Sequence, residues 1–456
     1  MPNQYKPTPP LDELTPHILR YWKTRLNDKE IVHALQKHFD TERYGIGLTK
    51  FRQICVDMGL ERSRWQGHTV ETIHEAVTEL RQMFPHAGTR EMIGLLFHEK
   101  NMSVAKSVMM SYFAAYEPEL VQQCKARRLK RKCFWAAGVN DLFTVDQHDK
   151  WLRFGLGLHT GIEPFSGRIM WIRVWHSNRN PQLILSYYLD TIAEYMPLIT
   201  QSDLGTKNYG IANAQTLLHQ RYDPALQGTL QHCWMRTKKN VMPEITWSQL
   251  RCRFTPGFET LLDEGVIEGW YDLGNTLHMM VFRWVFIPWL QQELDAYRDR
   301  VNNSAKRRDR NKVLPHGVPN LIYDSPEDFG ALDFKVSIDH EGIDYVRNFY
   351  INTSHPVFNI VPPTLGDFIE HCYDAMGRPA VTRSSVWTVY RNLLSAVQLA
   401  ENPHPNSLLT ENEDVAADAL PLIGGHGDLP FNEELDGMYY MGGVRGGLGL
   451  GSANIL

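Results

Sequence analysis

Three β-rich runs follow one another between residues 142 and 177, and their order limits the folds open to this chain more than any other feature. Their sequences are LFTVDQ, LRFGLGLHTGI and RIMWIRVWHS, and short turns join them. This spacing predicts an antiparallel meander. The helical run PQLILSYYLDTIAEYM and the short apolar run PLIT come next. A strand, a helix and a second strand in this order predict a crossover onto a parallel neighbour.

This order predicts an α/β fold with the mixed sheet of ribonuclease H-like proteins, in which three antiparallel strands precede parallel strands and helices flank the sheet. An all-α region with tandem helix-turn-helix units is expected before it. The chain has 456 residues, 43% of them apolar, which is enough for several globular domains. The expected segments are a flexible leader (1–11), a helix-turn-helix-like unit (12–66), a second such unit (67–122), a basic linker (123–138), a catalytic core (139–310), a mixed region (311–400) and a disordered acidic, Gly-rich tail (401–456).

Residues 12–66 contain two amphipathic segments around a Gly-containing turn. The segment NDKEIVHALQKHF has one apolar face and a capping residue at Asn27 or Asp28. The segment LTKFRQICVDMGL resumes the pattern and leaves Lys50 and Arg52 on its outer side. Two short helices in this arrangement predict a helix-turn-helix.

Residues 67–122 repeat the arrangement. The helix TREMIGLLFHEK precedes SVAKSVMMSYFAAY, which has a capping residue at Ser103 and leaves Lys106 exposed. Small three-helix cores are also common as plain scaffolds. Each unit alone therefore fits either DNA binding or a purely structural role.

A basic cluster, KARRLKRK, follows the two units and predicts contacts with phosphates. A solvated helix face or a nuclear-import signal explains the same residues. The net charge of −5 conceals a mildly basic body, because residues 401–456 hold nine acids and one base. Double-stranded DNA is the expected partner. The residues expected to contact it are Lys50, Arg52, Lys106, Lys125, Arg127, Arg128, Lys130, Arg131 and Lys132.

Other features of the sequence exclude several classes of protein. The six cysteines form no C-x-x-C pair, so neither a zinc site nor a redox motif is predicted, and a reduced compartment fits best. The leader MPNQYKPTPP is too polar and Pro-rich for a signal peptide. The most apolar run, LHMMVFRWVFIPWL, is too short to span a membrane and contains Arg283, so no membrane association is expected.

The stretch FTVDQHDK places Asp146 on the first strand, and Asp203 falls at the end of a later one. Strand ends are where sites gather in open α/β sheets. Glu244, at the start of a helix, is the best placed third acid for holding Mg²⁺. On spacing alone the three are a weak signal, since each of them also suits a turn or a first-turn helix position.

With their flanking residues, these segments resemble the integrase core domain family. Its DDE-type ribonuclease H-like domains are frequent in basidiomycete fungi and related to retroviral and retrotransposon integrases. The resemblance covers residues 12–335. Members look like D-G-x-D-K-L at the first acid, S-D-x-G-x-E at the second and N-x-R-I-E-x-x-W at the third. The matching segments here are VDQHDKWLRFGLGLHTGIEPFSGRI, SDLGTKNYGIANA and NVMPEITWSQL, with RRLKRKCFWAAGVNDLF before them.

The resemblance implies that Asp146, Asp203 and Glu244 are the catalytic acids and bind two Mg²⁺ or Mn²⁺ ions, about 3.5–4 Å apart. Asp146 would bridge the ions, and the other two acids would complete one shell each. The ions would activate a water for end nicking, or a DNA 3′-hydroxyl for strand transfer. The residues implied at the rim of the site are His148, Asp149, Lys150, Asn208, Asn240 and Trp247.

Three departures from the family pattern bear on activity. Lys207 stands where members usually have an acid, and Gly167 is an insertion. Pro243 disfavours helical geometry at Met242, which predicts a helix that begins at Pro243 with Glu244 in its first turn. A small rotation there would carry the carboxylate away from the metal.

The leading hypothesis is therefore an integrase or transposase-like polynucleotidyl transferase derived from a mobile element. A domesticated DNA-binding protein with a weak or silent metal site is the alternative, and a plain Mg²⁺-dependent nuclease is a third. The His-His-Cys-Cys zinc module of retroviral integrases is absent from the sequence. A nuclear location is expected, and a homo-oligomer is expected because integrases join two DNA ends at one target.

Overall fold

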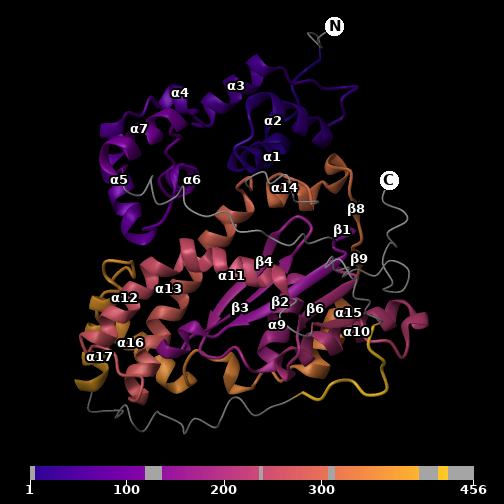
Figure 1. Ribbon diagram of the computed structural model, residues 1–456, viewed down its shortest axis with the longest axis vertical. Helices are drawn as coiled ribbons and strands as arrows, with labels where there is room; N and C mark the ends of the chain where they lie inside the picture. Colours follow the sequence, from indigo (N-terminus) through magenta and orange to yellow (C-terminus); the bar gives the residue numbers. More distant parts are fainter. Residues whose placement is uncertain (1–5, 119–135, 236–239, 307–313, 400–419, 430–456) are drawn as a thin grey trace.

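The computed structural model describes residues 6–118, 136–235, 240–306, 314–399 and 420–429. A helical region lies at one end of the molecule, with a sheet and further helices below it (Figure 1). The six bases of the cluster KARRLKRK and most of the acidic tail lie outside these ranges. No helix within these ranges is both long and apolar enough to cross a membrane.

The central sheet confirms the predicted strand order. Its strands, from one edge to the other, are β4 (Arg168–Trp175), β3 (Gly157–Glu163), β2 (Leu142–His148), β6 (Ile199–Asp203) and β7 (His232–Met235). The first three pair antiparallel, whereas β6 pairs parallel to β2 and β7 parallel to β6. This is the mixed, ribonuclease H-like arrangement expected from the sequence. The strand β7 adds to the expected elements, because its run HCWM is too short to show a pattern.

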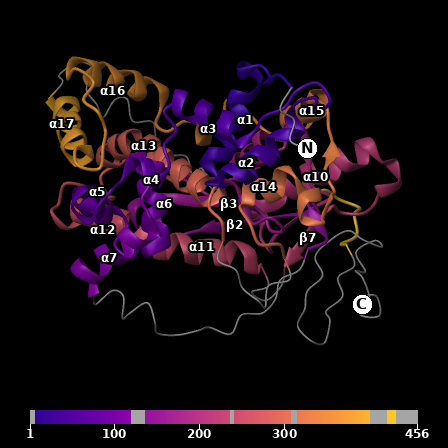
Figure 2. The ribbon, with the colours of Figure 1, turned by 90° about the horizontal axis from the view of Figure 1, so that it is seen from above.

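Helices cover both faces of the sheet because successive side chains of a strand point to opposite sides. Val145 points to one face and Asp146 to the other. α11 (Val241–Arg253) covers the face of Asp146, and Figure 2 shows α11 and α15 on opposite sides of the sheet. The helices packed on the face of Val145 are α9 (Pro181–Thr191), α10 (Tyr209–Tyr222) and α15 (His340–Tyr350).

Side chains and loops occupy both edges of the sheet, where a strand would otherwise leave backbone groups unpaired. The long helix α13 (Thr276–Asn302) runs beside β4. Its Gln291 accepts from the Val174 N–H at 3.0 Å, and Asn302 accepts from the Ile169 N–H at 2.9 Å. Near the start of β7, residues 420–429 return to the sheet, where the Leu230 N–H donates to Gly427 O at 3.0 Å.

The N-terminal region consists of two helical units. Asn27 caps α2 in a capping box, as the sequence predicts. The structure corrects two other expectations. Residues 36–47 separate α2 from α3, which is longer than the usual three- to four-residue turn of a helix-turn-helix. The last helix begins at Lys106 and not at Ser103, whose N–H instead donates to Gln66 Oε1 at 2.6 Å. The helices are α1 (Leu11–Lys23), α2 (Asp28–Leu35) and α3 (Leu48–Asp57), then α4 (Ser63–Gln66), α5 (Val70–Met83), α6 (Thr89–Lys100) and α7 (Lys106–Tyr116).

The two units attach to the core domain differently. The first unit has an apolar core of its own, and ion pairs link it to α13 (Lys23–Asp299 at 2.5 Å) and to the segment after residue 318 (Lys37–Asp328 at 2.6 Å). The second unit shares one continuous apolar core with α12 (Thr255–Ile267) and α13.

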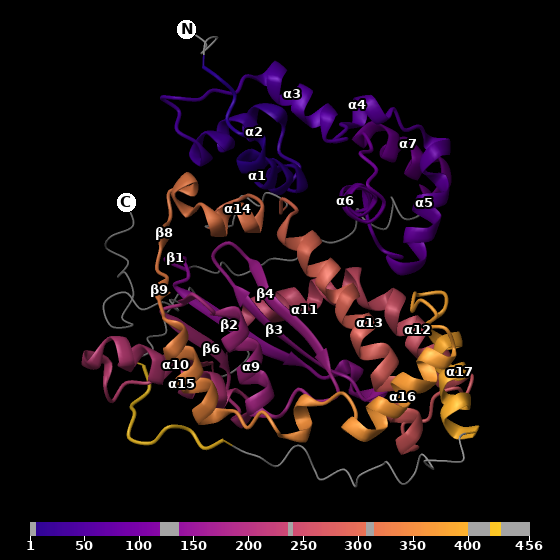
Figure 3. The ribbon, with the colours of Figure 1, turned by 180° about the vertical axis from the view of Figure 1, so that it is seen from behind.

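The mixed region after residue 313 is mainly helical and completes the same apolar core. Figure 3 shows α16 and α17 next to α12 and α13. The ring of Trp387 packs 4.6 Å from that of Phe286, and its indole N–H donates to Leu261 O at 2.8 Å. The frequent prolines made this region hard to predict, because two of them are the first residues of α14 and α16. The helices are α14 (Pro319–Asp324), α16 (Pro363–Ala375) and α17 (Val386–Leu399).

Gly257 is expected to be essential for the contact between the second helical unit and α12. A Cβ atom at this position would lie 2.1 Å from the backbone oxygen of Met83, at the end of α5. Gly257→Ala should therefore lower the free energy of unfolding by about 1–3 kcal/mol, as overpacking of a tight core does. Urea denaturation measures this loss. Gly424→Ala is the control and should leave the midpoint almost unchanged, since a Cβ atom added at Gly424 would have no neighbour within 4 Å.

Candidate active site

Asp146 and Asp203 lie side by side on neighbouring parallel strands. β2 pairs with β6 at a constant offset of 57 residues, for example Thr144 with Gln201, and the two aspartates are separated by the same 57 residues. Neighbouring strands are about 4.8 Å apart, and aligned residues of parallel strands point to the same face. The two carboxylates therefore share the face of the sheet that α11 covers.

Glu244 reaches this face from the first turn of α11. The helix begins at Val241, two residues before Pro243, with Asn240 as its N-cap residue. This corrects the expected start at Pro243. The first N–H groups of a helix have no acceptor within the helix, so a proline at the third position removes no hydrogen bond. Pro243 is thus compatible with a helix that presents Glu244 to the sheet.

Asn240 fixes the start of α11 against the sheet. Its side chain is almost fully buried, with 1% of the residue exposed. It donates from Nδ2 to Val145 O at 2.9 Å and accepts from Gln201 Nε2 at 3.2 Å. These two contacts tie the first turn of α11, and with it Glu244, to the two strands that carry the aspartates.

Asp146 and Glu244 line one pocket, whose volume is about 330 Å³. Lys150, Ser248 and Arg251 also line it, so two cations lie beside the two acids. Ser248 and Arg251 are four and seven residues after Glu244, which places the three on one face of α11. The sequence-based site did not include Ser248 or Arg251, although this helical spacing from Glu244 identifies both.

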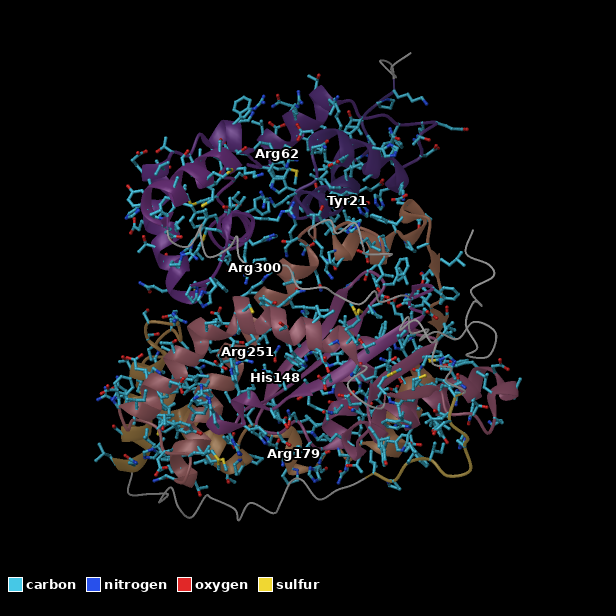
Figure 4. The ribbon with its side chains drawn as sticks, viewed as in Figure 1. Tyr21, Arg62, His148, Arg179, Arg251 and Arg300 are labelled. Atoms are coloured by element: carbon cyan, nitrogen blue, oxygen red, sulfur yellow. The ribbon has the colours of Figure 1, made fainter. Side chains whose placement is uncertain are left out.

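Trp247 holds the carboxylate of Asp146. Its indole N–H donates to Asp146 Oδ2 at 3.0 Å, and its ring stacks on His148 with centroids 4.8 Å apart. Burial, followed by the charge of Lys150, lowers the pKa of His148 to about 4, so this imidazole is neutral near pH 7. His148 and Arg251 both line the pocket and lie close together in Figure 4.

The acids of the site act on one another electrostatically. Burial is the main cause that raises the pKa of Asp146 to about 7, and the negative charges of Asp203 and Glu244 add to it. Burial also raises the pKa of Asp203. Carboxylates that disfavour each other's ionisation in this way are stabilised by a cation placed between them.

The donor set suits a hard cation such as Mg²⁺, since it consists of carboxylates. Asp203 does not line the pocket of Asp146 and Glu244. Among the residues that the structure describes, no three His, Cys, Asp or Glu side chains are close enough together to hold one ion. An ion shared by all three acids therefore requires a new rotamer at Asp203, which is half-buried, or at Glu244, which is exposed.

The other residues expected at the rim occupy two sides of the sheet. Lys150 lines the pocket, and Asp149 accepts from Asn178 Nδ2 at 2.8 Å beside it. Asn208 accepts from Gln147 Nε2 at 3.2 Å. Since Gln147 alternates with Asp146 along β2, Asn208 lies toward the opposite face.

The structure describes three of the nine residues that are expected to contact DNA. Lys50, Arg52 and Lys106 are all exposed, and Arg52 forms an ion pair with Asp28 at 2.9 Å. Lys125, Arg127, Arg128, Lys130, Arg131 and Lys132 lie outside the described residues.

The raised pKa of Asp146 gives the metal-free protein a specific dependence on pH. The unfolded chain releases this proton near pH 4, whereas the folded chain keeps it until about pH 7. The folded state thus binds more protons between these values, so its stability should fall as pH rises from 4 to 7 and level off above. Thermal unfolding in EDTA measures this slope. Asp146→Asn should flatten it, and an identical slope in this variant would contradict the assignment.

The comparison with known families agrees with this geometry. Residues 133–318 match the family described as Integrase core domain. This range includes all five strands of the sheet, α11 and the three acids. No curated protein is similar to the chain at a significant level. Residues 133–318 therefore form an integrase core domain of the ribonuclease H-like fold, preceded in the chain by helical units.

Proposed function

We propose that the protein is a polynucleotidyl transferase that cleaves and joins DNA, derived from a mobile element. The observation that carries the proposal is the shared pocket of Asp146 and Glu244, with Asp203 at the same level of the next strand, inside an integrase core domain. Three carboxylates on one side of a sheet are what phosphodiester chemistry with divalent metal requires.

The acidic and the basic residues of the site have separate roles. Asp146, Asp203 and Glu244 would hold two Mg²⁺ or Mn²⁺ ions, which supply Lewis-acid activation and neutralise charge on the scissile phosphate. Trp247 donates to one oxygen of Asp146 and so orients this carboxylate at the pocket. Lys150 and Arg251 place positive charge where a DNA phosphate would enter. The nucleophile is water for nicking and a 3′-hydroxyl for joining.

The test is Mg²⁺- or Mn²⁺-dependent nicking and strand transfer on labelled duplex oligonucleotides. We expect the wild type to produce nicked and joined products, and Asp146→Asn to produce neither while it still binds the duplex. Equal product from both proteins would assign the activity to a contaminant and overturn the proposal.

A second candidate is a DNA-binding protein that keeps the fold without catalysis. Two observations favour it. No three acidic, His or Cys side chains in the described part of the chain are close enough for one ion, and Lys207 replaces a usual acid of the family. In that case the wild type would bind the duplex at every metal concentration and never nick it. The same assay therefore separates the two functions.

Assembly and location follow from the same proposal. Joining two DNA ends at one target needs two active sites, so we propose a homo-oligomer on DNA and a nuclear location. Sedimentation of the protein with and without a duplex oligonucleotide tests the first point. A monomer on two joined ends would contradict it.

A further inference from the structure

The junction between the two N-terminal helical units carries an excess of guanidinium groups. We define the junction surface as Arg25, Arg62 and Arg90. Arg25 follows α1, Arg62 precedes α4, and Arg90 is in the first turn of α6. These residues are far apart in the sequence, and they meet where Phe97 of α6 packs against the apolar core of the first unit.

Contacts on both units place Arg25 and Arg62. The Arg25 guanidinium lies 5.4 Å from the ring centre of Phe97, which is two helical turns after Arg90 and therefore on its side of α6. Arg62 donates from Nη2 to Leu26 O at 2.8 Å, directly after Arg25, and stacks 3.9 Å from the ring centre of Trp22. Figure 4 shows Arg62 between the two units.

The backbone at Arg25 is held in an uncommon conformation. Its φ of 61° is in the left-handed region, which glycine adopts easily and a long side chain does not. Backbone strain of this kind is retained where the side chain has a function. Arginine here costs backbone strain that glycine would avoid, so Arg25→Gly removes the guanidinium without disturbing the backbone.

The charges on this surface are not balanced by acids. Asp28 forms ion pairs with Arg62 and Arg52, so one carboxylate serves two guanidinium groups. Neither Arg25 nor Arg90 has a carboxylate partner among the described residues. Packing against neighbours, and after it the charges of Arg62 and Arg90, lowers the pKa of Arg25. Guanidinium groups whose charges act on one another in this way favour an anion between them.

We propose that the junction surface binds the phosphate backbone of DNA, with Arg25 and Arg90 each contacting a phosphate. Guanidinium groups bind phosphate through paired, planar hydrogen bonds, which suits a backbone that crosses both units. Trp65, which follows Arg62 by three residues and is 76% exposed, offers an apolar ring to a neighbouring deoxyribose. This inference rests on the proposed function, which supplies DNA as the partner.

The experiment is fluorescence anisotropy of the full chain with a labelled 30-base-pair duplex in EDTA, over a series of salt concentrations. The variant is Arg25→Gly with Arg90→Gln. Two lost phosphate contacts should reduce the slope of log affinity against log salt by about two and weaken binding at 0.1 M salt at least tenfold. The matched control, Arg43→Gln with Arg391→Gln, removes two exposed arginines away from the junction and should stay within twofold of wild type.

Separate controls test whether the variant still folds and whether the site binds free anions instead of DNA. Glycine suits the backbone at position 25, so the variant should unfold at the same temperature as wild type or higher. Arg25→Lys with Arg90→Lys keeps the charges and should restore the salt slope. A slope equal to that of the arginine control would overturn the proposal. The proposal would also be overturned if the variant bound DNA as tightly as wild type but was no longer stabilised against thermal unfolding by inorganic phosphate. The site would then bind a free anion only.

Failure of this inference is distinguishable from failure of the proposed function. The junction variant should still nick DNA at saturating substrate concentration, with a raised KM and an unchanged kcat. If the wild type bound the duplex through the junction surface but never nicked it, the inference about this surface would stand. The proposed transferase activity would then be refuted.

Discussion

Glu244→Gln is expected to lower the rate of Mg²⁺-dependent nicking about 10²–10³-fold, with DNA affinity within twofold of wild type. The amide keeps the size of the side chain but removes the negative charge from one wall of the pocket. The carboxylate would help to hold a divalent ion, whose positive charge at a transferring phosphate contributes several kcal/mol. Each 1.36 kcal/mol is a factor of about ten in rate. Single-turnover cleavage of a labelled duplex measures the effect.

The matched control is Glu268→Gln, at an exposed glutamate that follows α12. It loses the same charge away from the pocket and should cleave at the wild-type rate. If both variants cleaved equally fast, Glu244 would have no role in catalysis. The first-turn position of α11 would then be structural only.

Asn240→Leu is expected to have the largest effect on both stability and activity. Leucine has a similar volume but leaves Val145 O and Gln201 Nε2 without their partners inside the protein. Two buried polar groups left unsatisfied cost about 2–4 kcal/mol, so the urea midpoint should fall clearly. Because the start of α11 is no longer tied to the strands, nicking should also fall more than about tenfold at temperatures where the variant is folded.

Asn348→Leu, at an exposed asparagine of α15, is the control for this substitution and should change neither quantity. Asn240→Asp gives a second comparison, since aspartate still accepts from Gln201 but cannot donate to Val145. A stable, fully active Asn240→Leu protein would show that α11 needs no anchor on the sheet.

Much of the core domain is predictable from the sequence because its strands are continuous and buried. The runs around β2, β3 and β4 have strong β propensity and short turns, so their pairing follows from order alone. The alignment of Asp146 with Asp203 needed the register of β2 and β6, which is a property of the folded sheet. The strand β7 is too short to carry a pattern of its own and depends on β6 as a template.

Other features depend on contacts between segments far apart in the chain. Asn240 is an ordinary polar residue in the sequence, and its role appears only when α11 meets the two strands. Arg251 is distinguished from other surface arginines only by its helical spacing from Glu244. The compact turn expected in the first helical unit is absent because η1 (Gln36–His38) and a further loop extend the connection.

The departures from the family pattern have local explanations. Pro243 fits the first turn of α11, where its missing N–H costs no hydrogen bond. Gly167 has a φ of 73° in the turn between β3 and β4, and Lys306 Nζ donates to its carbonyl at 2.7 Å. The positive φ favours glycine at this position, and a Cβ atom there would displace the Lys306 ammonium group. The structure offers no comparable reason for Lys207.

The central claim is that Asp146, Asp203 and Glu244 form one metal-binding set, and Asp203 is the member whose side chain lies outside the shared pocket. The most direct test is Mn²⁺ binding by electron paramagnetic resonance to wild type, Asp203→Asn and the control Asp190→Asn, whose aspartate pairs with Arg347 on α15. We expect wild type and the control to bind two ions per chain, and Asp203→Asn to bind fewer or to bind them at least tenfold more weakly. Equal stoichiometry and affinity in all three proteins would contradict the claim.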